Sequence, residues 1–168
     1  MTSKRVVKLK ASGPMRLSNH GRKRVALSMY VKGKNFLAAA ILLRNHGQPN
    51  ANEYVVLHLT CQGVENVLKG LLLLRDFKSY YRMLKQPLGH DLKKLVKTVI
   101  KEFHVRTLPK KYMDEINQLS NLYSKHILRY GNGYDILVNP STIPSELTLR
   151  KITAIVRLSE RYIKKECT

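Results

Sequence analysis

The stretch from residue 53 to about 76 constrains the fold most, because its small and apolar side chains recur at three- and four-residue spacing. The positions that follow this spacing are Val56, Leu59, Gly63, Val67, Gly70, Leu71 and Leu74. That period places them on one face of a helix. Leu57, Val64, Leu68 and Leu72 widen the apolar surface beyond one stripe. The pattern predicts a helix at the centre of a helical bundle, with Asn52 as its cap.

Two glycines interrupt this helical stretch. Gly63 and Gly70 lie seven residues apart, and glycine in a helix interior costs about 1 kcal/mol relative to alanine. The pair therefore predicts a face against which another helix packs closely.

Four other segments have helical periodicity, and the first three of them are followed by proline or glycine. They cover residues 30–45, 91–104, 113 to about 131, and a final stretch from Leu149. Asp91 is expected to cap the helix it precedes, by accepting backbone N–H bonds. The sequence thus predicts an all-α fold, an up-and-down bundle of about five helices with mostly short connections.

Positive charge dominates the composition: 31 Lys and Arg stand against 11 Asp and Glu, a formal net charge of +20. The first acidic residue is Glu53, so the N-terminal third is purely cationic. Residues 1–28 lack a helical period and are expected to form a basic arm, ordered in part at most, before a helical body at 29–168. Polyanions are the expected partners. The candidate nucleic-acid contacts in the arm are Lys4, Arg5, Lys8, Lys10, Arg16, Arg22, Lys23 and Arg24.

Several classes of protein are not favoured. No apolar run approaches the ~20 residues that span a bilayer, and the basic N-terminus lacks the apolar core of a secretory signal. A cytoplasmic protein without a membrane partner is expected. Cys61 and Cys167 are expected to be reduced thiols. The histidines lack metal-ligand spacing and no phosphate-binding loop is present, so neither a metal nor a cofactor is expected.

Three short motifs occur in a fixed order along the chain. The first runs Cys61-Gln62-Gly63-Val64-Glu65-Asn66-Val67-Leu68-Lys69-Gly70-Leu71-Leu72, the second is Gly89-His90-Asp91-Leu92, and the third comprises Tyr123 with Arg129-Tyr130. In this order they resemble the HEPN family of helical RNA-associated domains over roughly residues 33–165, although Gly131 stands where the family has proline. The resemblance implies a polar cluster of Gln62, Glu65, Lys69, His90, Asp91, Tyr123, Arg129 and Tyr130. It also implies a homodimer and a defence or toxin–antitoxin setting.

Catalysis is less favoured by the residues. HEPN ribonucleases carry an arginine followed by a histidine after four to six residues, and this chain has no such pair. The best substitute is His126 with Arg129, three apart on one helix face. These two side chains are candidates for catalysis or phosphate contact, or they complement the negative end of a helix dipole. Whether the protein is an enzyme stays open, with a non-enzymatic function favoured.

The first two motifs also have a structural interpretation. Glu65 and Lys69 are expected to form a partly buried polar cluster with His90, which would fix how the helix at 53–76 meets the helix at 91–104.

The sequence as a whole leaves three functional hypotheses: a HEPN-like domain that binds RNA or another polyanion, a metal-independent ribonuclease, and a helical adaptor that binds a protein partner.

Overall fold

The elements of the protein are helices throughout the part of the chain that the computed structural model describes, residues 17–46, 53–125, 128, 152–154, 156–161 and 164. They are α1 (Asn19–His46), α2 (Glu53–Arg75), α3 (Phe77–Met83), α4 (Leu92–Glu102) and α5 (Lys110–Ser124). Residues 152–154 and 156–161 are also helical. The expected all-α fold is confirmed.

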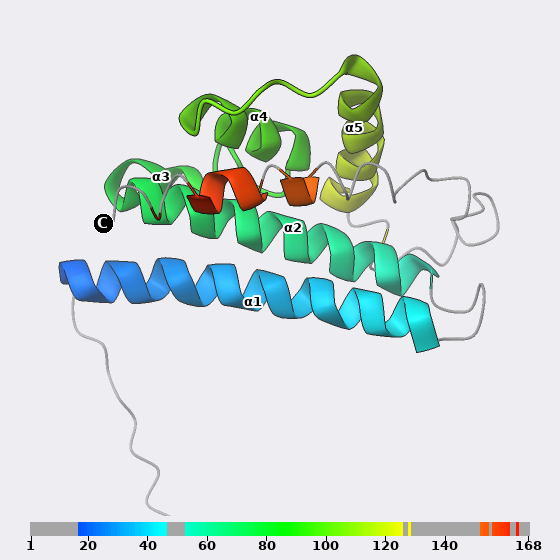
Figure 1. The fold of residues 1–168 in the computed structure, drawn as a ribbon, viewed down its shortest axis with the longest axis horizontal. Coiled ribbons are helices and arrows are strands. Elements are labelled where there is room, and N and C mark those ends of the chain that lie inside the picture. Colours follow the sequence, from blue (N-terminus) through cyan, green and yellow to red (C-terminus); the bar gives the residue numbers. More distant parts are fainter. Residues whose placement is uncertain are drawn as a thin grey trace, which may run out of the picture.

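Helix α2 lies at the centre, as its broad apolar surface predicted. It contacts α1, α3, α4 and α5. In Figure 1, α1 runs alongside α2 on one side, α3, α4 and the C-terminal helical residues lie on the other, and α5 stands steeply across them. Leucines and valines of α2 form one core with apolar residues of α4 and α5, among them Leu95, Val99, Ile116 and Tyr123.

Small residues let helices α1 and α2 approach each other closely. The buried residues of α1 are Ala26, Gly33 and Ala40, each seven positions apart. A Cβ atom on Gly33 would lie 2.5 Å from the backbone nitrogen of Val67. Added Cβ atoms would also lie 2.7 Å from the Leu37 side chain at Gly63 and 2.7 Å from the Tyr30 backbone nitrogen at Gly70. The predicted close helix contact at Gly63 and Gly70 is confirmed.

Helix α1 begins at Asn19, well before the expected start at residue 30. Residues 19–28, which the sequence placed in the basic arm, are therefore helical, and that boundary was wrong. Ser18 explains the early start, because its side-chain oxygen accepts the Gly21 N–H at 3.1 Å in the manner of an N-cap. Residues 1–16 of the expected arm lie outside the described residues.

Two further differences concern short local signals. The expected connector after α2 contains α3, whose N-cap Asp76 accepts the Ser79 N–H at 3.1 Å. Helix α5 begins at Lys110, directly after Pro109 and earlier than expected. Helix α4 agrees with the prediction, including its cap: Asp91 accepts the Lys94 N–H at 2.9 Å.

Helix α1 exposes much of its apolar surface. Leu27, Val31, Ile41, Leu42 and Leu43 are all exposed. Among the described residues, α1 is the one helix long and apolar enough to cross a membrane by length and composition, with a mean hydropathy of 1.2 over its most apolar window. Core helices of soluble proteins and signal sequences meet the same criterion, so this feature is weak support for a membrane span.

Candidate functional site

A buried carboxylate, that of Glu65 on α2, lies at the centre of the most elaborate polar cluster among the described residues. Its Oε1 accepts a hydrogen bond from Lys69 Nζ at 2.6 Å. Its Oε2 lies 2.5 Å from the Tyr123 hydroxyl and 3.0 Å from His90 Nδ1. The Glu65 and Lys69 side chains are only 5% and 9% exposed. Because a buried charge needs both an opposite charge and hydrogen bonds, this set explains how α2 tolerates Glu65.

The Tyr123 hydroxyl joins α5 to two residues of α2. It lies 3.0 Å from Gln62 Oε1 as well as 2.5 Å from Glu65 Oε2. A phenol carries a single proton, and the nearer, charged carboxylate is the stronger acceptor. The hydroxyl proton is therefore donated to Glu65. The 3.0 Å contact with Gln62 is a hydrogen bond when the Gln62 amide is oriented so that its NH₂ group donates to the phenol oxygen.

The electrostatics of the cluster favour an ionised Glu65. Burial alone raises the pKa of this carboxyl group, but hydrogen bonds from Lys69, Tyr123 and His90 outweigh it, so the pKa lies below its ordinary value of 4.5. Nearby, burial and the negative charge of Glu65 raise the pKa of the Cys61 thiol to about 12. Cys61 is a free, buried cysteine and stays protonated at neutral pH, which makes it a poor nucleophile.

The turn before α4 brings His90 to the cluster. Gly89 has a φ of +46°, a left-handed conformation that favours glycine. Asp91 then fixes the start of α4, and its Oδ1 also accepts the Ser120 hydroxyl of α5 at 3.2 Å. Burial raises the pKa of Asp91, but the hydrogen bonds from Lys94 and Ser120 outweigh burial, so the pKa is lowered on balance.

His90 is the solvent-facing member of the cluster. Its side chain is 46% exposed, while the Glu65 carboxylate that contacts its Nδ1 is 5% exposed. A carboxylate at Nδ1 fixes the orientation of an imidazole ring. The arrangement can therefore present an oriented histidine edge to a phosphate or another polar ligand.

The predicted cluster is brought together in part. Gln62, Glu65, Lys69, His90 and Tyr123 converge, and Asp91 holds the adjacent turn. Arg129, Tyr130 and the alternative pair His126 with Arg129 lie outside the described residues. Of the candidate nucleic-acid contacts, Arg22, Lys23 and Arg24 lie on α1, and Lys4, Arg5, Lys8, Lys10 and Arg16 lie outside the described residues.

His58 was missed by the sequence reasoning. Its ring centroid lies 5.8 Å from that of Tyr123, and His90 approaches the same ring edge-on, also at 5.8 Å. His58 precedes Gln62 by four residues and Glu65 by seven, so helical spacing would have placed it on the face of the cluster. Within the described part of the chain, no group of three or more His, Cys, Asp or Glu side chains could hold a metal ion.

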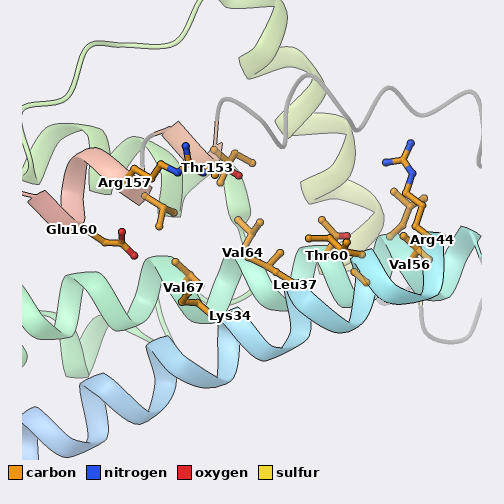
Figure 2. A pocket seen from close by; sticks show the side chains of 15 residues that line it. Lys34, Leu37, Arg44, Val56, Thr60, Val64, Val67, Thr153, Arg157 and Glu160 are labelled. Carbon is orange, nitrogen blue, oxygen red and sulfur yellow. The ribbon is translucent and has the colours of Figure 1, made fainter. Parts of the chain in front are cut away.

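A separate apolar groove runs between α1, α2 and the C-terminal helical residues (Figure 2). Its volume is about 380 Å³. Figure 2 shows Leu37, Val64 and Val67 at its floor, with Arg157 and Glu160 on the opposite wall. Lys34 and Arg44 of α1 also line it. The groove thus has an apolar floor and a mainly cationic border.

Comparison with known proteins gives no match: no family model, no curated protein and no solved structure is significantly similar to the chain.

Proposed function

We propose that this protein is a HEPN-like helical domain that binds RNA or another polyanion, acts as a homodimer, and serves in a defence or toxin–antitoxin setting. The observation that carries the binding proposal is the charge excess, 31 basic against 11 acidic side chains. An excess of this size attracts nucleic acid through its phosphates.

The surface of α4 supports binding to a polyanion. Lys94, Lys97 and Lys101 are exposed, at helical spacing, while Leu95 and Val99 on the other side are buried. Lys97 and Lys101 line a hollow of about 610 Å³ with residues of the connection to α5. Cations arranged along a helix contact phosphates without reading bases, so little sequence preference is expected.

The cluster at Glu65 supports the HEPN-like part of the proposal. Five of the eight residues that the resemblance implies contact one another although they come from three separate segments. The alternative, a metal-independent ribonuclease, needs a histidine to move protons and a cation to stabilise the phosphorane. His90 is the described histidine best placed for that role.

One experiment separates the three hypotheses. The full chain is titrated with a mixed RNA pool at several salt concentrations, with excess chelator, and RNA integrity is followed on the same samples. Binding without cleavage is expected. Cleavage that His90→Ala abolishes would establish the ribonuclease instead. If no RNA binds even at low salt, the polyanion proposal fails and the adaptor hypothesis replaces it.

The contribution of the N-terminal cations is tested by deleting residues 1–16, which spares α1. The deletion removes five cations, Lys4, Arg5, Lys8, Lys10 and Arg16. If four of them contact phosphate, the slope of log affinity against log salt should fall by about 3, at roughly 0.7 per single-strand contact. An unchanged slope would show that the helical body alone carries binding.

The homodimer is tested by sedimentation velocity of the wild type and of Leu42→Lys. Leu42 is 59% exposed on α1, beside Ile41, which is also 59% exposed. Exposed apolar side chains of this kind are what an interface would bury. A dimer that Leu42→Lys dissociates, with its helical content retained, is the expected result; a wild-type monomer at all concentrations would remove the homodimer from the proposal.

A further inference from the structure

A second basic hollow lies between the beginning of α1 and α3. Its volume is about 530 Å³. The residues that line it are Leu17, Arg22, Phe77, Lys78, Ser79, Tyr81 and Arg82. Three of them are cations and none is acidic, and two are aromatic. This hollow is separate from both the Glu65 cluster and the apolar groove.

The two aromatic rings of this hollow stack on each other. Phe77 and Tyr81 are four residues apart on α3, with ring centroids 4.9 Å apart and an interplanar angle of 15°. Tyr81 is 53% exposed, and α3 has no buried residue. A short helix thus displays an aromatic pair that the core does not use.

The neighbouring residue, Tyr80, explains how α3 is held in place. Its hydroxyl donates to Glu102 Oε2 at 2.6 Å, and Arg75 Nε contacts Glu102 Oε1 at 3.4 Å. Burial and the Glu102 carboxylate raise the pKa of Tyr80. Because consecutive helical side chains point about 100° apart, anchoring Tyr80 to α4 leaves Tyr81 directed elsewhere.

The three cations of the hollow make no ion pair with the carboxylates of the described residues. The ion pairs among the described residues are made by Lys69, Arg75, His90 and Lys94, and not by Arg22, Lys78 or Arg82. The acidic residue nearest to them in sequence is Asp76, which attracts Lys78 electrostatically. Its carboxylate already accepts the Ser79 N–H at 3.1 Å and the Ser79 hydroxyl at 2.5 Å. The positive charge therefore remains available to an anion.

We infer that this hollow is a nucleotide subsite for single-stranded RNA, in which a base stacks on the Phe77–Tyr81 pair and the flanking phosphates contact Arg22, Lys78 and Arg82. A bare phosphate would use the cations but not the rings, whereas a nucleotide uses both. Aromatic platforms beside cations are how proteins bind single strands without sequence preference. The inference rests on the proposed RNA binding and names where a base is held.

The chain offers a direct optical test, since it contains no tryptophan. Tyr81→Trp introduces a single indole at an exposed position of α3. A stacked base is expected to quench the indole fluorescence when oligoadenylate binds the full chain, and inorganic polyphosphate is expected to bind without quenching. If oligoadenylate binds, as fluorescence anisotropy of the labelled strand reports, but the indole fluorescence does not change, the subsite is wrong while RNA binding stands.

Two variants test the rings and the cations separately. Tyr81→Leu keeps an apolar helix former and should weaken oligoadenylate binding by roughly 5- to 150-fold, the range for one stacked base, with polyphosphate affinity unchanged. Lys78→Gln/Arg82→Gln should lower the salt slope by about 1.4 for two single-strand contacts. Equal loss of both ligands in Tyr81→Leu would overturn the stacking role.

The matched control is Lys110→Gln/Lys111→Gln at the start of α5, which removes the same charge from another exposed surface. At saturating oligoadenylate, it should leave the quenching of the introduced indole unchanged when combined with Tyr81→Trp, whereas Lys78→Gln/Arg82→Gln should reduce that quenching. Identical quenching in both combinations would place the base elsewhere. If the wild-type chain binds no RNA at low salt, the proposed function and this subsite fail together.

Discussion

The two faces of α2 are held by opposite kinds of contact. Gly63 and Gly70 let the backbone of α1 approach until an added Cβ would clash. Glu65 points away from Gly63, because side chains two positions apart on a helix point about 200° apart. Its carboxylate meets α5 and the turn before α4 through hydrogen bonds. One face depends on the absence of side chains and the other on the presence of charged ones. They should therefore respond to different substitutions.

The largest effect is expected from breaking the charge pair. Glu65→Leu leaves the Lys69 ammonium buried without its carboxylate, and removing one partner of a buried pair typically costs about 3 to 5 kcal/mol. The free energy of unfolding from urea titration measures this loss. Glu65→Leu/Lys69→Met should recover most of it, since no buried charge remains. A double variant as unstable as the single one would contradict this account.

Overpacking the glycine face comes next. Gly70→Leu should lower the free energy of unfolding by about 3 kcal/mol, the upper end of the usual overpacking range, because the obstacle is the backbone of Tyr30, 2.7 Å from an added Cβ. The matched control is Gly21→Leu on α1, where an added Cβ would meet only side-chain atoms at 3.4 Å or more. That variant should gain up to about 1 kcal/mol of helix propensity. Equal effects at both positions would show that close packing does not distinguish them.

A smaller effect is expected from the hydroxyl of Tyr123. Tyr123→Phe keeps the buried ring but removes the hydrogen bond to Glu65. We expect the free energy of unfolding to fall by about 1.5 kcal/mol, the lower end for hydrogen bonds to charged groups, because Lys69 and His90 still form hydrogen bonds with the Glu65 carboxylate. Thermal unfolding of the variant beside the wild type measures it, and a stability gain would show that the phenol hydroxyl is poorly satisfied there.

The smallest effect is the loss of folding stability expected at acid pH. The pKa of Glu65 is lower in the folded protein than its ordinary value of 4.5, so the unfolded chain binds the proton more readily. The resulting stability is present above pH 4.5 and is lost as pH falls through the folded-state value. Asp91, whose pKa is also lowered, adds an effect of the same sign. In a urea series of decreasing pH, Glu65→Gln should show a shallower acid-dependent loss than the wild type; an identical profile would exclude Glu65 as a contributor.

The sequence by itself determined the all-α class, the extent of α2, the close contact at Gly63 and Gly70, and the Asp91 cap. Each of these features follows from the spacing of apolar residues or from a residue type with a local backbone preference. The missed start of α1 was also local, because Ser18 is an ordinary N-cap residue, but no apolar period accompanies it in the arm.

Only the tertiary structure decided what surrounds Glu65 and what forms the hollow at α3. The Tyr123 hydroxyl reaches Glu65 across 58 positions of sequence, and Arg22 lines one hollow with Phe77 although they belong to different helices. Contacts between residues so far apart in sequence depend on the angles and offsets at which helices pack. For α2, the glycines on one face and the charged residues on the other set these angles and offsets together. A helical period fixes which side chains share a face, but not which partner that face meets.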